Sequence, residues 1–148
     1  MSNSLELIRS NPKLYLGDVE PSGFLLATRL AESALISGAL RVESRVLDAG
    51  WIAVTGESDW ITPSAHKTRK GISLERVFTG LMPQDGGTPN EVRFEPIVTA
   101  FSRSLAVKSD RHWSVIVGEL PSDEVRHLLA DAKFAVAFHC LRRLQGVK

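Results

Sequence analysis

Histidine side chains carry the most versatile chemistry in this sequence, because an imidazole can bind a metal ion, transfer a proton or activate a nucleophile. The chain has four histidines, His66, His112, His127 and His139. The intervals between them do not match the short spacings of zinc ligands. No serine lies in the glycine-flanked turn that exposes a hydrolase nucleophile. The sequence therefore predicts neither a metal centre nor a Ser–His–Asp site, and it predicts surface or boundary positions for His127 and His139.

The densest charge in the chain is a basic run from His66 to Lys70, which reads His-Lys-Thr-Arg-Lys. Such a run is typical of a solvated loop, and it is also the kind of patch that contacts phosphate groups. No aromatic residues are interleaved with it, so stacking on single-stranded nucleic acid is not indicated. Arg69 and Lys70 are the candidates for a nucleic-acid contact, and both interpretations of the run stay open.

The composition is that of one soluble globular domain. The chain has 148 residues, 43% of them hydrophobic and 24% charged, with a formal net charge of +1. This charge gives no general argument for nucleic acid or for a membrane surface. The single cysteine, Cys140, cannot form an internal disulfide and is expected to be a small buried residue. No signal peptide and no apolar run of about 20 residues is present, so we expect a single cytoplasmic domain over residues 1–148.

Hydrophobic periodicity predicts alternating groups of helices and hairpins. Apolar residues at helical spacing indicate four helices, and alternating apolar residues indicate two hairpins. The expected helices are 4–10, 22–38, 72–81 and 95–103, and the expected hairpins join 41–47 to 51–56 and 104–109 to 112–118. Residues 82–91, with two prolines and two glycines, are the clearest loop. This order favours an α+β fold with helices on one face of a largely antiparallel sheet.

The last element is predicted to be a long helix over 121–145. Its start carries capping and acidic residues, and its end carries two arginines, which suits the helix dipole. Its apolar surface is wider than one core-facing stripe requires. The extra surface, which includes Phe134, Phe138 and Leu141, either completes the core or forms an association surface for a partner.

Several motifs resemble the ATPase domain of the gyrase B family of type II topoisomerase subunits. The stretch "NPKLYLGDVEPSG" resembles that family's "RPGMYIG" and the acidic turn that follows it. "DAGWIAVTGESDWITP" resembles the strand that ends in "DDGRGIP", and "PIVTAFSRSLAVKS" resembles "SVVNALSERLEVEV". The resemblance covers residues 5–118 and implies the GHKL, or Bergerat, fold of histidine kinase-like ATPases. That fold is a two-layer α/β sandwich with a mixed, mostly antiparallel sheet, and it holds nucleotide between its helices and a mobile lid.

The residues that handle nucleotide in that family are replaced here. The family's general base falls at Leu30 and its magnesium ligand at Ala34, and neither side chain can accept a proton or coordinate a cation. The family's aspartate that binds adenine aligns with Gly56 or, if the alignment shifts by one residue, with Glu57. Trp60 replaces a glycine and would crowd the adenine plane. The lid glycines that wrap the triphosphate correspond to "NEVRFEP" at 90–96, which contains no glycine.

Retained fold motifs beside lost chemical motifs indicate a non-catalytic domain that works through protein–protein contacts. The replaced residues predict that neither ATP nor magnesium is a cofactor. The resemblance implies a protein partner, which is a second copy, a related GHKL protein or a topoisomerase. One alternative is a nucleotide sensor or slow ATPase, with Glu57 on the base and Glu32 as a displaced acid. A second alternative is a DNA-contacting accessory protein that uses Arg69 and Lys70. No membrane association is expected.

Overall fold

One antiparallel sheet organises the fold. The computed structural model describes residues 3–16, 22–61, 73–80 and 94–141. The strands of its five-stranded sheet follow the spatial order β1-β2-β5-β3-β4, and each neighbouring pair is antiparallel. Their bounds are β1 Glu43–Val46, β2 Trp51–Gly56, β3 Ser102–Ser109, β4 His112–Val117 and β5 Phe134–Cys140. The α+β class and the two predicted hairpins, β1–β2 and β3–β4, are thereby confirmed.

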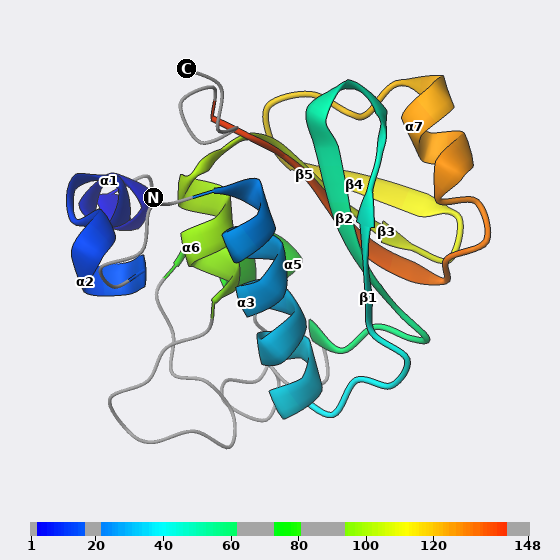
Figure 1. Cartoon of the computed structure of the whole chain (residues 1–148), viewed down its shortest axis with the longest axis horizontal. Coiled ribbons are helices and arrows are strands. Elements are labelled where there is room, and N and C mark those ends of the chain that lie inside the picture. Colours follow the sequence, from blue (N-terminus) through cyan, green and yellow to red (C-terminus); the bar gives the residue numbers. More distant parts are fainter. Residues whose placement is uncertain (1–2, 17–21, 62–72, 81–93, 142–148) are drawn as a thin grey trace.

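Five helices gather on one face of the sheet (Figure 1). They are α1 Asn3–Ser10, α2 Pro12–Leu16, α3 Gly23–Ile36, α5 Leu74–Thr79 and α6 Glu95–Ala100. Leu26 and Leu30 of α3 and Phe78 of α5 join Val54 and Val136 of the sheet in the larger hydrophobic core. The Arg9 side chain on α1 donates to the carbonyl of Ala100 at 2.5 Å, which ties α1 to the end of α6.

The first turn of α3 is fitted closely to the sheet. Ser22 is the N-cap, and its hydroxyl accepts a hydrogen bond from the amide of Leu25 at 3.1 Å. A β-carbon on Gly23 would lie 2.7 Å from the Ile52 side chain and 2.9 Å from the Cys140 sulfur. Glycine is therefore required for this helix to approach the strands so closely. The predicted start and extent of the long helix are confirmed to within two residues.

The opposite face of the sheet carries α7, Asp123–Leu128, and a smaller core. Val125 and Leu129 pack there against Trp51, Ala53 and Ala137. The expectation that helices lie on one face is therefore incomplete, because α7 covers part of the other face. The small alanine side chains of β2 and β5 leave room for this short helix to pack closely.

The predicted long helix over 121–145 is wrong. α7 ends at Leu128, and residues 134–140 form β5, the central strand of the sheet. The β5 sequence FAVAFHC is apolar almost throughout because a central strand is covered on both faces. A short continuous apolar run of this kind cannot be distinguished from a buried helix by periodicity alone. The large side chains of β5 face the α3 layer and its alanines face α7.

None of the described helices is long and apolar enough to cross a membrane.

Candidate functional site

The candidate site is the space between α3 and the end of β2, where the sequence placed a degenerate nucleotide pocket. Leu30 and Ala34 lie one helical turn apart on the sheet-facing side of α3, and both are fully buried. Both belong to the larger hydrophobic core, together with Val54 of β2 and Phe134 of β5. These two positions therefore contribute apolar packing, with no group that could hold a proton or a cation.

Trp60 fills the space beside the end of β2. A β-carbon on Gly56 would lie 2.8 Å from the indole ring of Trp60, so no larger residue fits at position 56 without moving that ring. The indole also contacts the Phe134 ring edge-on, with ring centroids 4.7 Å apart and planes at 75°. Its exposed fraction is 3%. The indole thus occupies the volume that a side chain at position 56 would need.

Two polar atoms in this region are buried without a hydrogen-bond partner. They are the indole nitrogen of Trp60 and the hydroxyl oxygen of Ser33, and neither contacts a donor or acceptor in the described part of the chain. An unsatisfied buried polar group costs about 1–3 kcal/mol. Apolar contacts therefore stabilise the packing around Trp60 and α3, and they outweigh the cost of burying the Trp60 indole nitrogen and the Ser33 hydroxyl without partners.

Glu32 and Glu57, the acids proposed for an altered nucleotide site, both point to solvent. Glu32 lies on the exposed side of α3, 3.5 Å from the Arg29 guanidinium, and its side chain is 57% exposed. Glu57 follows β2, 3.6 Å from the Arg41 guanidinium, and its side chain is 50% exposed. Each acid is thus paired with its own surface arginine and is separated from the buried positions Leu30 and Ala34 by the fold itself.

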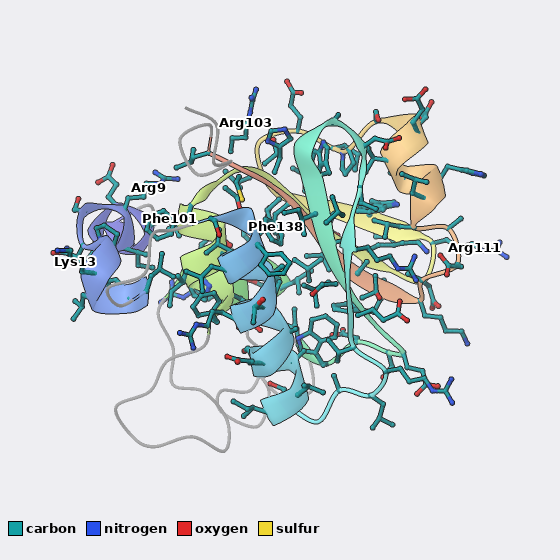
Figure 2. All side chains as sticks on the ribbon, viewed as in Figure 1. Arg9, Lys13, Phe101, Arg103, Arg111 and Phe138 are labelled. Atoms are coloured by element: carbon teal, nitrogen blue, oxygen red, sulfur yellow. The ribbon has the colours of Figure 1, made fainter. Side chains whose placement is uncertain are left out.

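The predicted association surface on the last helix is contradicted by the structure. Phe134 and Phe138 have exposed fractions of 1% and 0%, and both lie in the core between the sheet and α3. Figure 2 shows Phe138 inside the fold, whereas Arg103 and Arg111 project outward. Leu141 is half-buried and packs against the same core. The physical reason is the strand conformation of β5, which places these aromatic rings under the helical layer.

Some predicted residues fall outside the described residues. Arg69 and Lys70, the candidates for nucleic-acid contact, lie in the undescribed range 62–72, and the first part of the lid-like stretch lies in 81–93. Its last two residues, Glu95 and Pro96, form the first turn of α6, where both are buried. The part of the lid stretch that the structure describes is therefore integral to a core helix.

Within the described residues, no group of three or more histidine, cysteine, aspartate or glutamate side chains could hold a metal ion. His127 is exposed and His139 is half-buried. Cys140 is buried, as expected, and burial raises the pKa of its thiol to about 11. Cys140 is therefore a poor nucleophile at neutral pH, since only the thiolate reacts.

A polar cleft on the α7 face was not predicted from the sequence. It has a volume of about 370 Å³ and lies where β1 begins and β2 ends, at the end of the hairpin away from its turn. Arg45 binds Asp131 in it through two hydrogen bonds of 2.9 and 3.1 Å. These bonds and the positive charge of Arg45 lower the pKa of Asp131. The partners are 86 residues apart in sequence, so only the folded sheet brings them together.

Lys108 is a buried cation that sequence inspection also missed. Its exposed fraction is 7%, and its ammonium group donates to the carbonyl oxygens of Leu129 at 3.0 Å, Ala130 at 3.5 Å and Ala132. Three carbonyl acceptors at the end of α7 compensate the burial of this charge. Lys108 therefore joins β3 to the turn that precedes β5, and its role is structural.

No protein-family model matches the sequence, and no curated protein matches it. Solved structures do match the fold. The 43K ATPase domain of Thermus thermophilus gyrase B, solved in complex with an aminocoumarin, superposes with a TM-score of 0.56 at 18% identity. The match covers 99% of this chain and 42% of that one. The gyrase B subunit of Myxococcus xanthus matches with a TM-score of 0.49 at 20% identity, over 97% of this chain and 44% of that one.

This chain thus spans less than half of the gyrase structures it resembles. At this level of identity the likeness concerns the backbone architecture. The chain has a GHKL fold of the gyrase B ATPase type.

Proposed function

We propose that this chain is a non-catalytic GHKL domain that has lost ATP hydrolysis and acts through contacts with a protein partner. The observation that carries the proposal is the position of Trp60. Its indole lies where a side chain at position 56 would project, and it packs on Phe134 at 4.7 Å. A nucleotide base would have to displace this ring from the core.

The chemistry of α3 supports the loss of hydrolysis. Activation of water for attack on a phosphate requires a proton acceptor within hydrogen-bond reach. Magnesium requires oxygen ligands. Leu30 and Ala34 supply neither, and both are fully buried among apolar neighbours. The same two side chains contribute to the stability of the domain, so the loss of chemistry coincides with a gain in packing.

The surface supports a protein partner. Large apolar side chains exposed on a folded domain mark interaction surfaces when they gather on one side. Phe24 and Val46 are 76% and 80% exposed, and both line one groove. Within this proposal the partner is a second copy, a related GHKL protein or a topoisomerase, and the location is cytoplasmic.

Isothermal titration calorimetry tests the closed pocket. The purified chain is titrated with ATP and with a non-hydrolysable analogue, with and without magnesium. We expect no saturable heat at concentrations up to several hundred micromolar. Binding tighter than about 100 µM, which corresponds to about 5.5 kcal/mol, would contradict a filled pocket. A Trp60→Ala variant is the matched control, because it vacates the indole volume while leaving Leu30 and Ala34 in place.

A nucleotide sensor that uses Glu32 and Glu57 has weaker support, since both carboxylates point to solvent and pair with arginines. The DNA-contacting alternative depends on Arg69 and Lys70, which lie outside the described residues. A salt-dependent DNA mobility shift that disappears when both residues are neutralised would favour it.

A further inference from the structure

The strand β1 lies at the edge of the sheet, and half of its backbone groups point away from β2. The amide of Leu47 donates to the carbonyl of Trp51 at 2.8 Å, so Leu47 faces β2. Backbone direction alternates along an antiparallel strand, so Ser44 and Val46 direct their amides and carbonyls outward. In the described part of the chain these outward groups form no backbone hydrogen bonds. An open edge of this kind is a template for another strand.

Exposed apolar side chains accompany this open edge. Val46 is 80% exposed and lines a groove of about 300 Å³ together with Phe24, which is 76% exposed at the start of α3. Leu35 is 57% exposed near the end of α3. Eleven residues make about three helical turns, so Leu35 projects from the same side of α3 as Phe24. The side of α3 next to β1 therefore presents a large apolar residue at each end.

We propose that this edge binds a second copy of the chain, with the two β1 strands antiparallel about a two-fold axis through Ser44. The inference rests on the proposed function, because it names the protein partner. The paired strands join the two sheets into one continuous sheet. Ser44 faces Ser44 of the second copy and exchanges two backbone hydrogen bonds with it, and Val46 lies opposite Val42 of the second copy.

Charge selects this register over its neighbours. Glu43 and Arg45 flank Ser44 and project on the α7 face of the sheet, like their partners Thr55 and Ala53 in β2. With the axis at Ser44, Glu43 lies opposite Arg45 of the second copy, and the reverse pair forms by symmetry. An axis at Glu43 or at Arg45 would instead place like charges directly opposite each other, which is destabilising. The guanidinium of Arg45 binds Asp131 and lies 3.4 Å from Glu43 of its own strand, whose side chain is 66% exposed. Glu43 of the second copy therefore meets a cation that these contacts already hold in place.

The helices complete the interface on the other face. Phe24 lies beside Val46, at the carboxyl end of β1, and α3 then runs back toward the start of β1 (Figure 1). A two-fold axis at Ser44 therefore brings Phe24 toward Leu35 of the second copy. β1 has only four residues, so few strand hydrogen bonds can form and we expect a weak dimer, with a Kd on the order of 10 µM.

Analytical ultracentrifugation from about 1 to about 500 µM protein tests the dimer. The mass of the wild-type chain should rise from 16.2 kDa toward twice that value. Val46→Lys places a charge on the open edge and should weaken association at least about tenfold. Val115→Lys is the matched control, because Val115 is 46% exposed on β4, the opposite edge strand. This control should dimerise like the wild type.

Cysteine cross-linking tests the register. Residues that face each other in a hydrogen-bonded antiparallel pair have Cα atoms about 5.5 Å apart, which suits a disulfide. Ser44→Cys should therefore form a covalent dimer under mild oxidation. Glu43→Cys should not form one, because residue 43 faces Arg45 of the second copy. The two cysteines at position 43 would lie two residues apart along the paired strands. The native Cys140 is buried and does not compete.

A wild-type chain that stays at 16.2 kDa throughout the concentration range would overturn the inference. So would equal dimerisation of Val46→Lys and the wild type, or more efficient cross-linking at position 43 than at position 44. These failures leave the closed nucleotide pocket unaffected, since calorimetry with ATP reports on it separately. Tight ATP binding, in turn, would contradict the proposed function even if the β1 dimer forms.

Discussion

Replacing Leu30 by glutamate places a carboxylate at the position that the resemblance to gyrase B assigns to the general base. Leu30 is fully buried in the larger core. Loss of its apolar burial costs about 2–3 kcal/mol, and a neutral carboxyl group without a partner adds about 1–3 kcal/mol. We therefore expect Leu30→Glu to lower the free energy of unfolding by about 3–6 kcal/mol at about pH 5. A filled pocket has no water to solvate the new group.

The pH dependence identifies burial as the cause. Burial raises the pKa of a carboxyl group in the folded state above the value of about 4.3 in the unfolded chain, by about 3 units for a fully buried group. The folded variant then binds more protons than the unfolded chain between these two values. Its stability therefore falls as the pH rises, by about 1.4 kcal/mol per pH unit. Between about pH 5 and about pH 8 the additional loss is about 3 kcal/mol.

Urea denaturation followed by far-UV circular dichroism measures this difference at both pH values, after subtraction of the wild-type curve. Leu30→Gln is the uncharged control, and its destabilisation should not change with pH. Leu35→Glu is the exposed control on the same helix, at a position that is 57% exposed. At about 1 µM protein, well below the expected Kd of the dimer, it should change the free energy of unfolding by less than about 0.5 kcal/mol. If Leu30→Glu is as stable as Leu35→Glu at both pH values, or if it hydrolyses ATP, the pocket is open and the reasoning fails.

Three further outcomes follow from contacts elsewhere in the fold. Lys108→Met removes the donor to three carbonyls and should lower the free energy of unfolding by about 1–3 kcal/mol in urea titrations, whereas the exposed Lys133→Met should have almost no effect. Arg45→Ala should raise the pKa of Asp131 toward 3.8 in an NMR titration, because Arg45 lowers it. The ion pair stabilises the fold above about pH 3.8, and this stabilisation is lost as the pH falls through the lowered pKa of Asp131. An unchanged pKa of Asp131 in Arg45→Ala would contradict the bidentate contact. Cys140, with a pKa of about 11, should not react with a thiol reagent at about pH 8 until urea unfolds the chain.

The sequence alone determined the two hairpins, the long helix α3 and the likeness to gyrase B over residues 5–118. These depend on short-range signals, such as the Ser22 cap, the spacing of apolar residues in α3 and the turns of the two hairpins. Local signals of this kind act within a few residues of the chain, so they can be recognised before the fold is known. The prediction that Leu30 and Ala34 replace a base and a magnesium ligand rests on residue types alone, and the structure adds that both side chains are fully buried.

The tertiary structure decided what the apolar residues after 121 do. Phe134 and Phe138 are equally compatible with a buried helix and with a central strand, and only pairing with β2 and β3 on both sides selects the strand. That choice removes the predicted association surface and places Phe134 against Trp60. The open edge at β1 likewise exists only because the strand order leaves it unpaired. Long-range strand pairing, which no local pattern encodes, therefore determines both the contact of Phe134 with Trp60 and the open edge of β1.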